Sequence, residues 1–263
     1  MQQNTHPLDS VHKVWLAFGL TWAAGFVDIV GYIFLDHILS ANMSGNTVEI
    51  AFHFFHLNST QAFARIWAVL LFVVGLFLCA CIHEACRRHG ISTSGAITLG
   101  LESLLLIILA VAGTRSAWSG DLAAHSPMMF YFLLALACAA MGLQNATLTN
   151  IGALTVRTTH VTGTLSKFAE SGSRYLFWFY DKTRGPGQYR FREAFRLSFH
   201  HPDFQDAGIT ALLWIGFLAG GFCGIWLHHL WKLKCLFVPI ALLVGFALTD
   251  IMRPYTNMFR KEQ

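Results

Sequence analysis

Six long apolar runs follow one another along the chain, and polar segments separate them. A helix rises about 1.5 Å per residue, so roughly 20 apolar residues cross the ~30 Å hydrocarbon layer of a bilayer. The runs cover residues 14–35, 66–82, 96–113, 128–150, 209–227 and 235–251, and the fourth has an unusually polar tail from 142 onward. This pattern predicts an all-α polytopic membrane protein with six transmembrane helices.

Two further helical runs, 47–57 and 164–179, are shorter, and each follows small polar residues that can cap a helix. An apolar helix too short to span lies at the membrane surface or re-enters the side from which it came. Re-entry is favoured, because the polar leaders supply irregular backbone that membrane depth tolerates only where protein or water satisfies it. We therefore predict two re-entrant half-helices.

An internal repeat relates the two halves of the chain. The segment 40–51 recurs in altered form as 158–169, and 25–28 aligns with 142–145 with one residue of slippage. The aligned pairs are Asp28 with Asn145, Asn42 with His160, Ser44 with Thr162, Gly45 with Gly163 and Glu49 with Lys167. Residues 13–114 and 127–252 are therefore predicted to be two repeats within the single membrane domain 1–263.

Composition and charge agree with membrane insertion. Hydrophobic residues make up 55% of the 263 residues and charged residues 12%, and the mean hydropathy is +0.51. This charged fraction is about half of that in a typical soluble domain. The net charge of +4 is explained by basic loops and does not indicate nucleic-acid binding.

Basic residues are unequally distributed between the two sides that the spans define. Eleven Lys and Arg residues fall in loops and termini on one side and four on the other. The positive-inside rule places the richer side, with both termini and the basic loop 181–206, in the cytoplasm. This requires the first short helix to enter from outside and the second from inside, which makes an inverted 3+3 repeat.

The starts of the two half-helices form the predicted binding site. If both reach the bilayer centre, their unpaired N–H groups and positive dipole ends favour an anionic or polar solute there. The predicted lining is Asp28, Asn42, Ser44, Gly45, Asn46, Thr47, Gln144, Asn145, Arg157, His160, Thr162, Gly163 and Thr164. Asp28 and His160 can take up a coupling proton, although both also have a purely structural interpretation. For Asp28, that alternative is bonding to the broken backbone opposite it.

Three further ionisable residues have alternative interpretations as well. Glu49 either closes a capping box over 46–49 or pairs with Lys167 across the pseudo-axis. Glu102 has no counterpart in the second repeat, and is either paired within the bundle or a second protonatable site. No metal or cofactor is expected, because packing explains the shared helix face of Cys79, His83 and Cys86.

The most specific segments of the two repeats are 25–28, 41–47, 142–146 and 156–165. They resemble the signature segments of the YoaK-like family, a domain-of-unknown-function family of bacterial inner-membrane proteins, and the similarity extends over nearly all of the chain. The resemblance implies about six spans and an inner-membrane location, but no substrate. Departures are His160, where an aromatic residue such as Tyr is expected, and Ser166-Lys167 in place of Thr-Asp.

Secondary transport of a small anionic or polar solute is the function that these features favour, with proton coupling left open. A passive channel for a small solute is the alternative, followed by a non-transport scaffold or enzyme. An enzyme is not expected, because the sequence has no nucleophile motif, phosphate loop or zinc-type spacing. The expected partners are the solute and the lipid bilayer, with anionic headgroups against 181–206, and a homo-oligomer remains open.

Overall fold

The chain forms an all-helical bundle, which a computed structural model describes over residues 7–116, 126–150, 161–184 and 191–255. The helices are α1 (Pro7–Phe34), α2 (Met43–Phe55), α3 (Ser59–Arg88), α4 (Ser94–Ser116), α6 (Pro127–Asn150), α7 (Val161–Arg184), α8 (Phe191–Ser198), α9 (Pro202–Trp231), the 3-10 helix η2 (Lys232–Leu236) and α10 (Phe237–Met252). Within these ranges there is no β-strand.

Five described segments are long and apolar enough to cross a bilayer. They are Val14–Phe34, Ser59–Arg88, Ser94–Arg115, Pro127–Thr147 and Pro202–Met252. The last of them contains two helices, α9 and α10, which η2 joins. The prediction of an all-α, multi-pass membrane protein is confirmed.

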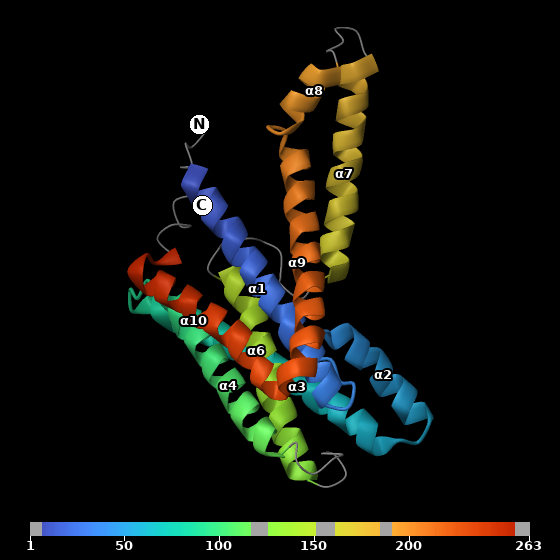
Figure 1. The fold of residues 1–263 in the computed structure, drawn as a ribbon, viewed down its shortest axis with the longest axis vertical. Helices are drawn as coiled ribbons and strands as arrows, with labels where there is room; N and C mark the ends of the chain where they lie inside the picture. Colours follow the sequence, from blue (N-terminus) through green and yellow to red (C-terminus); the bar gives the residue numbers. More distant parts are fainter. Residues whose placement is uncertain (1–6, 117–125, 151–160, 185–190, 256–263) are drawn as a thin grey trace.

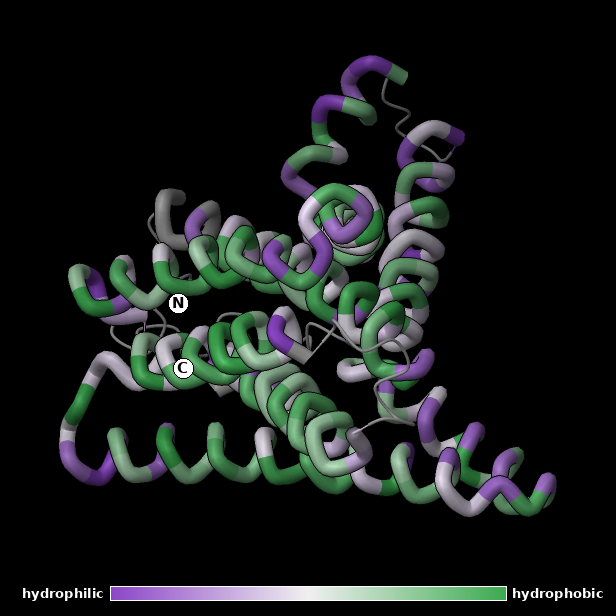
Figure 2. The backbone as a smooth tube through the Cα atoms, turned by 60° about the horizontal axis from the view of Figure 1, so that its bottom comes forward, coloured by the Kyte–Doolittle hydropathy of each residue, from purple (hydrophilic) through white to green (hydrophobic). Residues whose placement is uncertain are grey.

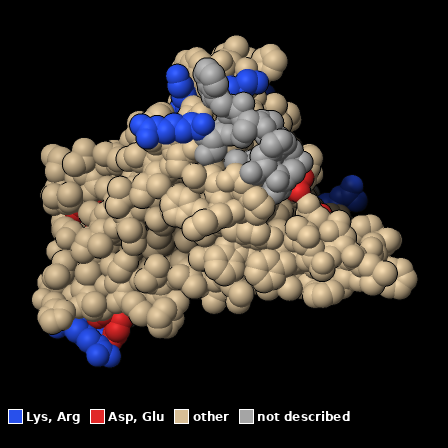
Figure 3. Space-filling view, turned by 90° about the horizontal axis from the view of Figure 1, so that it is seen from below, with Lys and Arg blue, Asp and Glu red and all other residues tan. Residues whose placement is uncertain are grey.

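The outer surface of the bundle is apolar. Large side chains are exposed along the spanning helices, for example Phe77 of α3 at 68% and Trp226 of α9 at 65%. Hydrophobic residues follow most of the bundle and hydrophilic residues gather toward helix ends (Figure 2), and one broad face is almost without charged side chains (Figure 3). Continuous apolar surface of this extent indicates contact with lipid.

Helices α1 and α9 approach so closely that their contact requires glycine. A Cβ atom at Gly25 of α1 would overlap the carbonyl oxygen of Phe217, and one at Gly220 of α9 would overlap that of Trp22. Small residues allow such backbone contact in membranes, where van der Waals packing drives helix association. The two helices therefore form a tightly packed pair.

The contact between α3 and α6 repeats this geometry. A Cβ atom at Gly75 would overlap the carbonyl oxygen of Ala139, and one at Gly142 would overlap that of Phe72. The equivalent pairs are Gly25 with Gly142 and Trp22 with Ala139, each 117 residues apart, and Gly75 with Gly220 and Phe72 with Phe217, each 145 residues apart. The same reciprocal glycine contact thus occurs twice, once between α1 and α9 and once between α3 and α6.

Helices α2 and α7 contain the two segments for which the sequence predicts half-helices. Helix α2 has 13 residues, about 20 Å of helix, and it begins at Met43 rather than at residue 47. Helix α7 has 24 residues, about 36 Å of helix, so its predicted end near residue 179 is wrong. Both begin near the centre of the bundle and run toward opposite ends, α2 beside α3 and α7 beside α9 (Figure 1).

The segment 181–206, predicted as a basic loop, is mostly helical in its described part. It contains the end of α7, all of α8 and the beginning of α9. Tyr175 Oη of α7 donates to Ser198 Oγ of α8 (2.8 Å), and Arg174 Nε of α7 pairs with Asp203 of α9 (2.8 Å). These contacts hold the three helices together as one unit.

Candidate functional site

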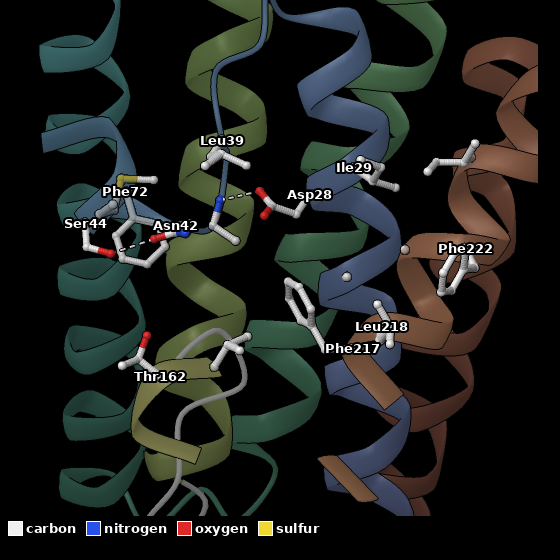
Figure 4. A pocket seen from close by; sticks show the side chains of 16 residues that line it. Asp28, Ile29, Leu39, Asn42, Ser44, Phe72, Thr162, Phe217, Leu218 and Phe222 are labelled. Carbon is white, nitrogen blue, oxygen red and sulfur yellow. Dashed lines mark hydrogen bonds between the residues drawn. The ribbon is translucent and has the colours of Figure 1, made fainter. Parts of the chain in front are cut away.

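A cavity of about 820 Å³ lies where the starts of α2 and α7 meet α1 and α9. Its wall is made by α1, the segment 39–42 before α2, the first residues of α2 and α7, Phe72 of α3 and one face of α9 (Figure 4). A cavity of this size accommodates a small-molecule ligand. The two segments that the sequence analysis aligned as repeats therefore border one cavity.

Helix α1 contributes Asp28, which is the charged side chain among the described lining residues. It is 6% exposed, and its Oδ1 accepts hydrogen bonds from the backbone N–H of Ala41 (2.8 Å) and from Ser40 Oγ (3.1 Å). Both interpretations of Asp28 thus fit the structure. The carboxylate holds the broken backbone before α2, and it also borders the cavity.

The start of α2 is fixed by two asparagines. Asn42 is the N-cap: its Oδ1 accepts from the backbone N–H of Gly45 (3.3 Å) and from Ser44 Oγ (2.7 Å). Asn46 is 1% exposed; its amide donates to the carbonyl oxygen of Leu39 (2.7 Å) and accepts from the N–H of Leu39 (3.3 Å). Asn42 supplies an acceptor because a helix start leaves backbone N–H groups without partners, while Asn46 fixes the segment before the helix through Leu39.

The predicted capping box over 46–49 is wrong, because the helix begins four residues earlier. Glu49 instead pairs with Arg65 of α3, so the predicted pair with Lys167 is also wrong. Arg65 is 5% exposed and its Nη1 also donates to the carbonyl oxygen of Gln61 (3.3 Å). This pair ties α2 to the first turns of α3, within one predicted repeat rather than between the two.

Four of the predicted binding residues line the cavity, namely Asp28, Asn42, Ser44 and Thr162. Five others lie next to it in the first turns of α2 and α7 without lining it, namely Gly45, Asn46, Thr47, Gly163 and Thr164. Arg157 and His160 lie outside the described residues. Two of the predicted residues, both on α6, are buried away from the cavity wall, namely Gln144 and Asn145.

Gln144 has a structural contact. It is fully buried, and its Nε2 donates to the carbonyl oxygen of Leu20 in α1 (2.9 Å). This hydrogen bond joins the first helices of the two predicted repeats. Gln144 therefore supports the bundle behind the site.

Glu102 of α4 is fully buried, and neither of its carboxylate oxygens has a hydrogen-bond partner among the described residues. It does not line the cavity. An unpaired buried carboxylate is costly in its charged form, so this environment suits the neutral acid. The predicted pairing of Glu102 within the bundle is not found in the described part of the chain.

Replacing Glu102 with leucine is expected to raise the thermal unfolding temperature, because the change removes a polar group whose burial without a partner costs about 1–3 kcal/mol. Thermal melting of the purified variant and wild type measures the change in unfolding temperature. Ser103→Ala is the matched control, since Ser103 Oγ is satisfied by the carbonyl oxygen of Leu99 (2.7 Å). A lower melting temperature for Glu102→Leu than for Ser103→Ala would contradict the expectation.

The apolar wall of the cavity was missed by sequence reasoning. Phe72, Phe217, Leu218, Phe222 and Ile225 contribute to it. Within a membrane span, such residues give the same signal whether they face lipid, core or a cavity. The glycine-rich run of α9 was the available indication that backbones approach each other here.

Comparison with known proteins agrees with the resemblance that the signature segments indicate. The family described as "Protein of unknown function (DUF1275)" matches residues 16–249. A Bacillus subtilis (strain 168) protein, "UPF0700 transmembrane protein YoaK", is 25% identical over 159 residues, which cover 60% of this chain and 67% of that protein. No solved structure matches.

Proposed function

Because the chain belongs to the DUF1275 family, whose description states no activity, we propose a function from its own geometry: secondary transport of a small polar or anionic solute. The observation that carries the proposal is the cavity in which the starts of α2 and α7 meet beside buried Asp28. Helix starts supply N–H donors and a positive dipole end. Secondary transporters use such discontinuous helices to bind solutes near the bilayer midplane.

We further propose that the bundle is an inverted repeat of three plus three spans, with α9 and α10 as separate spans. The repeated glycine contact supports this, because both of its positions relate α1 to α6 at 117 residues and α3 to α9 at 145 residues. Helices α2 and α7, which run from the cavity toward opposite ends, take the same place in each repeat (Figure 1). Movement of one repeat against the other would then expose the cavity to each side alternately.

We propose that the protein lies in a bacterial inner membrane, with both termini on the cytoplasmic side. The start of α1 and the end of α10 lie at the same end of the bundle (Figure 1), and Asp250 Oδ2 accepts from the N–H of Ala96 at the start of α4 (2.6 Å). Arg87 and Arg88 close α3 just before α4. Basic residues gathered at this end support the cytoplasmic assignment.

Helix α8 is suited to the membrane surface. Phe191 and Phe195 of α8 and Phe199 just after it recur at intervals of four residues and are 68%, 49% and 53% exposed, and Arg192 and Arg196 are their neighbours in the sequence. Only residues 199–201 separate α8 from α9, which begins a candidate span. We therefore assign the lipid headgroup region as the partner of this helix.

Filling the cavity is the direct test of transport. A Cβ atom at Gly221 would have a single neighbour, Gly25 O at 3.9 Å, so Gly221→Phe places a ring into the cavity without a backbone clash. Solutes are first found by a melting screen of the wild type against anions, amino acids, nucleobases and organic acids. We expect Gly221→Phe to lower the uptake of a solute found in this screen into proteoliposomes at least about tenfold. The ring moves the bound solute away from its productive position, and such misplacement is costly.

Gly245→Phe is the control, because nothing lies within 4 Å of a Cβ atom at that position on α10. It should retain wild-type uptake and stability. Equal uptake by the wild type and Gly221→Phe would refute transport through this cavity. Flux that is uncoupled and does not saturate would instead identify a passive channel.

A further inference from the structure

The cavity has a polar side and an apolar side. In Figure 4, Asn42, Ser44 and Thr162 lie on one side, at the starts of α2 and α7, while Leu218 and Phe222 of α9 lie on the other. Asp28 borders the space between the two sides. A solute that matched this wall would carry its polar group at one end only.

The apolar side of the cavity is also part of the outer surface. Leu218, Phe222 and Ile225 are 43%, 65% and 47% exposed although they line the cavity. All three belong to the candidate span Pro202–Met252, so the part of their exposed area that lies outside the cavity faces hydrocarbon. The cavity therefore borders the lipid along this side of α9.

The place where α7 begins explains the opening. Helix α7 packs along α9, but its first described residues, Val161 and Thr162, already line the cavity. Beyond that point α9 continues for a further stretch that includes Phe222 and Ile225, and no described helix covers their side chains. Among the described residues, a helix that starts within the bundle thus leaves this stretch of α9 uncovered.

From these observations we propose that the solute is amphipathic, with a hydrogen-bonding head at Asp28 and the helix starts and an apolar body against α9. It enters the cavity from the bilayer, along the exposed side of α9. This inference rests on the proposed transport function and specifies its substrate class. A small inorganic ion or a wholly polar metabolite would leave Phe217, Leu218 and Phe222 without a matching surface.

Binding of homologous series tests the substrate class. The probes are n-alkyl amines, n-alkyl alcohols and n-alkyl carboxylates of increasing chain length, added to the protein in phosphatidylcholine nanodiscs. Burial of each methylene is expected to tighten binding about fourfold in at least one series until the cavity is full. The series that binds best identifies the head group.

Two variants separate cavity binding from partition into lipid. Gly221→Phe should abolish the dependence on chain length, and Gly245→Phe should retain it. A dependence that is equal in Gly221→Phe and the wild type, or binding that does not change with chain length, would overturn the amphipathic class. If short polar solutes alone bind, and Gly221→Phe blocks them, the class is wrong while transport through the cavity stands.

Photocrosslinking tests entry from the bilayer. With p-benzoylphenylalanine in place of Phe222, irradiation in nanodiscs should give a lipid adduct by mass spectrometry, and a bound amphiphile should reduce its yield. The same substitution at Phe26, which is fully buried, should give none. Absence of a lipid adduct at position 222 would rule out the lateral opening, whatever the binding experiment shows.

Discussion

Gly220→Leu is expected to separate α1 from α9 and to destabilise the protein by about 3 kcal/mol or more, the upper range for overpacking. Its Cβ atom would meet the backbone carbonyl of Trp22, which has no rotamer through which to move aside. The whole helix must therefore shift. Thermal unfolding in nanodiscs and the recovery of monodisperse protein measure the effect.

Gly208→Leu is the control on the same helix, because nothing lies within 4 Å of a Cβ atom there. It adds the same side chain to α9 and should leave the melting temperature nearly unchanged. Gly142→Leu in α6 should be as damaging as Gly220→Leu if the two glycine contacts are equivalent. Equal melting temperatures for Gly220→Leu and Gly208→Leu would show that α1 and α9 tolerate separation.

Asp28→Asn is expected to abolish uptake driven by a pH gradient while leaving the fold intact. The asparagine oxygen still accepts from the N–H of Ala41 and from Ser40 Oγ, so the backbone before α2 stays in place. An asparagine cannot take up a proton, so it cannot serve as the coupling site that the sequence suggests for Asp28. Uptake of a screened solute into proteoliposomes, with and without an imposed gradient, measures the loss.

Asp28→Ala separates the two roles of this residue. It removes the acceptor as well as the titrating group, so the N–H of Ala41 loses its partner, at a cost of about 1–3 kcal/mol. A lower melting temperature for Asp28→Ala than for Asp28→Asn is therefore expected. Undiminished pH-driven uptake by Asp28→Asn would remove Asp28 from the coupling mechanism and leave only its structural role.

The sequence predicted the spans well because their signal is long and continuous. The run 14–35 corresponds to the candidate span Val14–Phe34 and the run 96–113 to Ser94–Arg115, with ends that differ by at most two residues. The repeat also located the cavity, since the aligned segments at Ser44 and Thr162 both line it. What these features share is dependence on local composition and on spacing along the chain.

Errors arose where tertiary contacts decide the outcome. Two asparagines, Asn42 and Asn46, are both suitable caps, and the hydrogen bonds of Asn46 to Leu39 leave Asn42 as the cap. Glu49 was matched with its repeat counterpart, but the turn into α3 brings Arg65 closer. Helix α7 continues beyond its predicted end because it packs along α9, a contact that periodicity does not reveal.

The crossed helix pairs have a consequence for biosynthesis. Helix α1 finds its main partner in α9, and α3 finds its partner in α6. Helix α1 must therefore remain in the bilayer with its glycine face uncovered until α9 has been translated. Neither half can complete its packing alone, so the helix bundle can finish folding only after α9 has been synthesised.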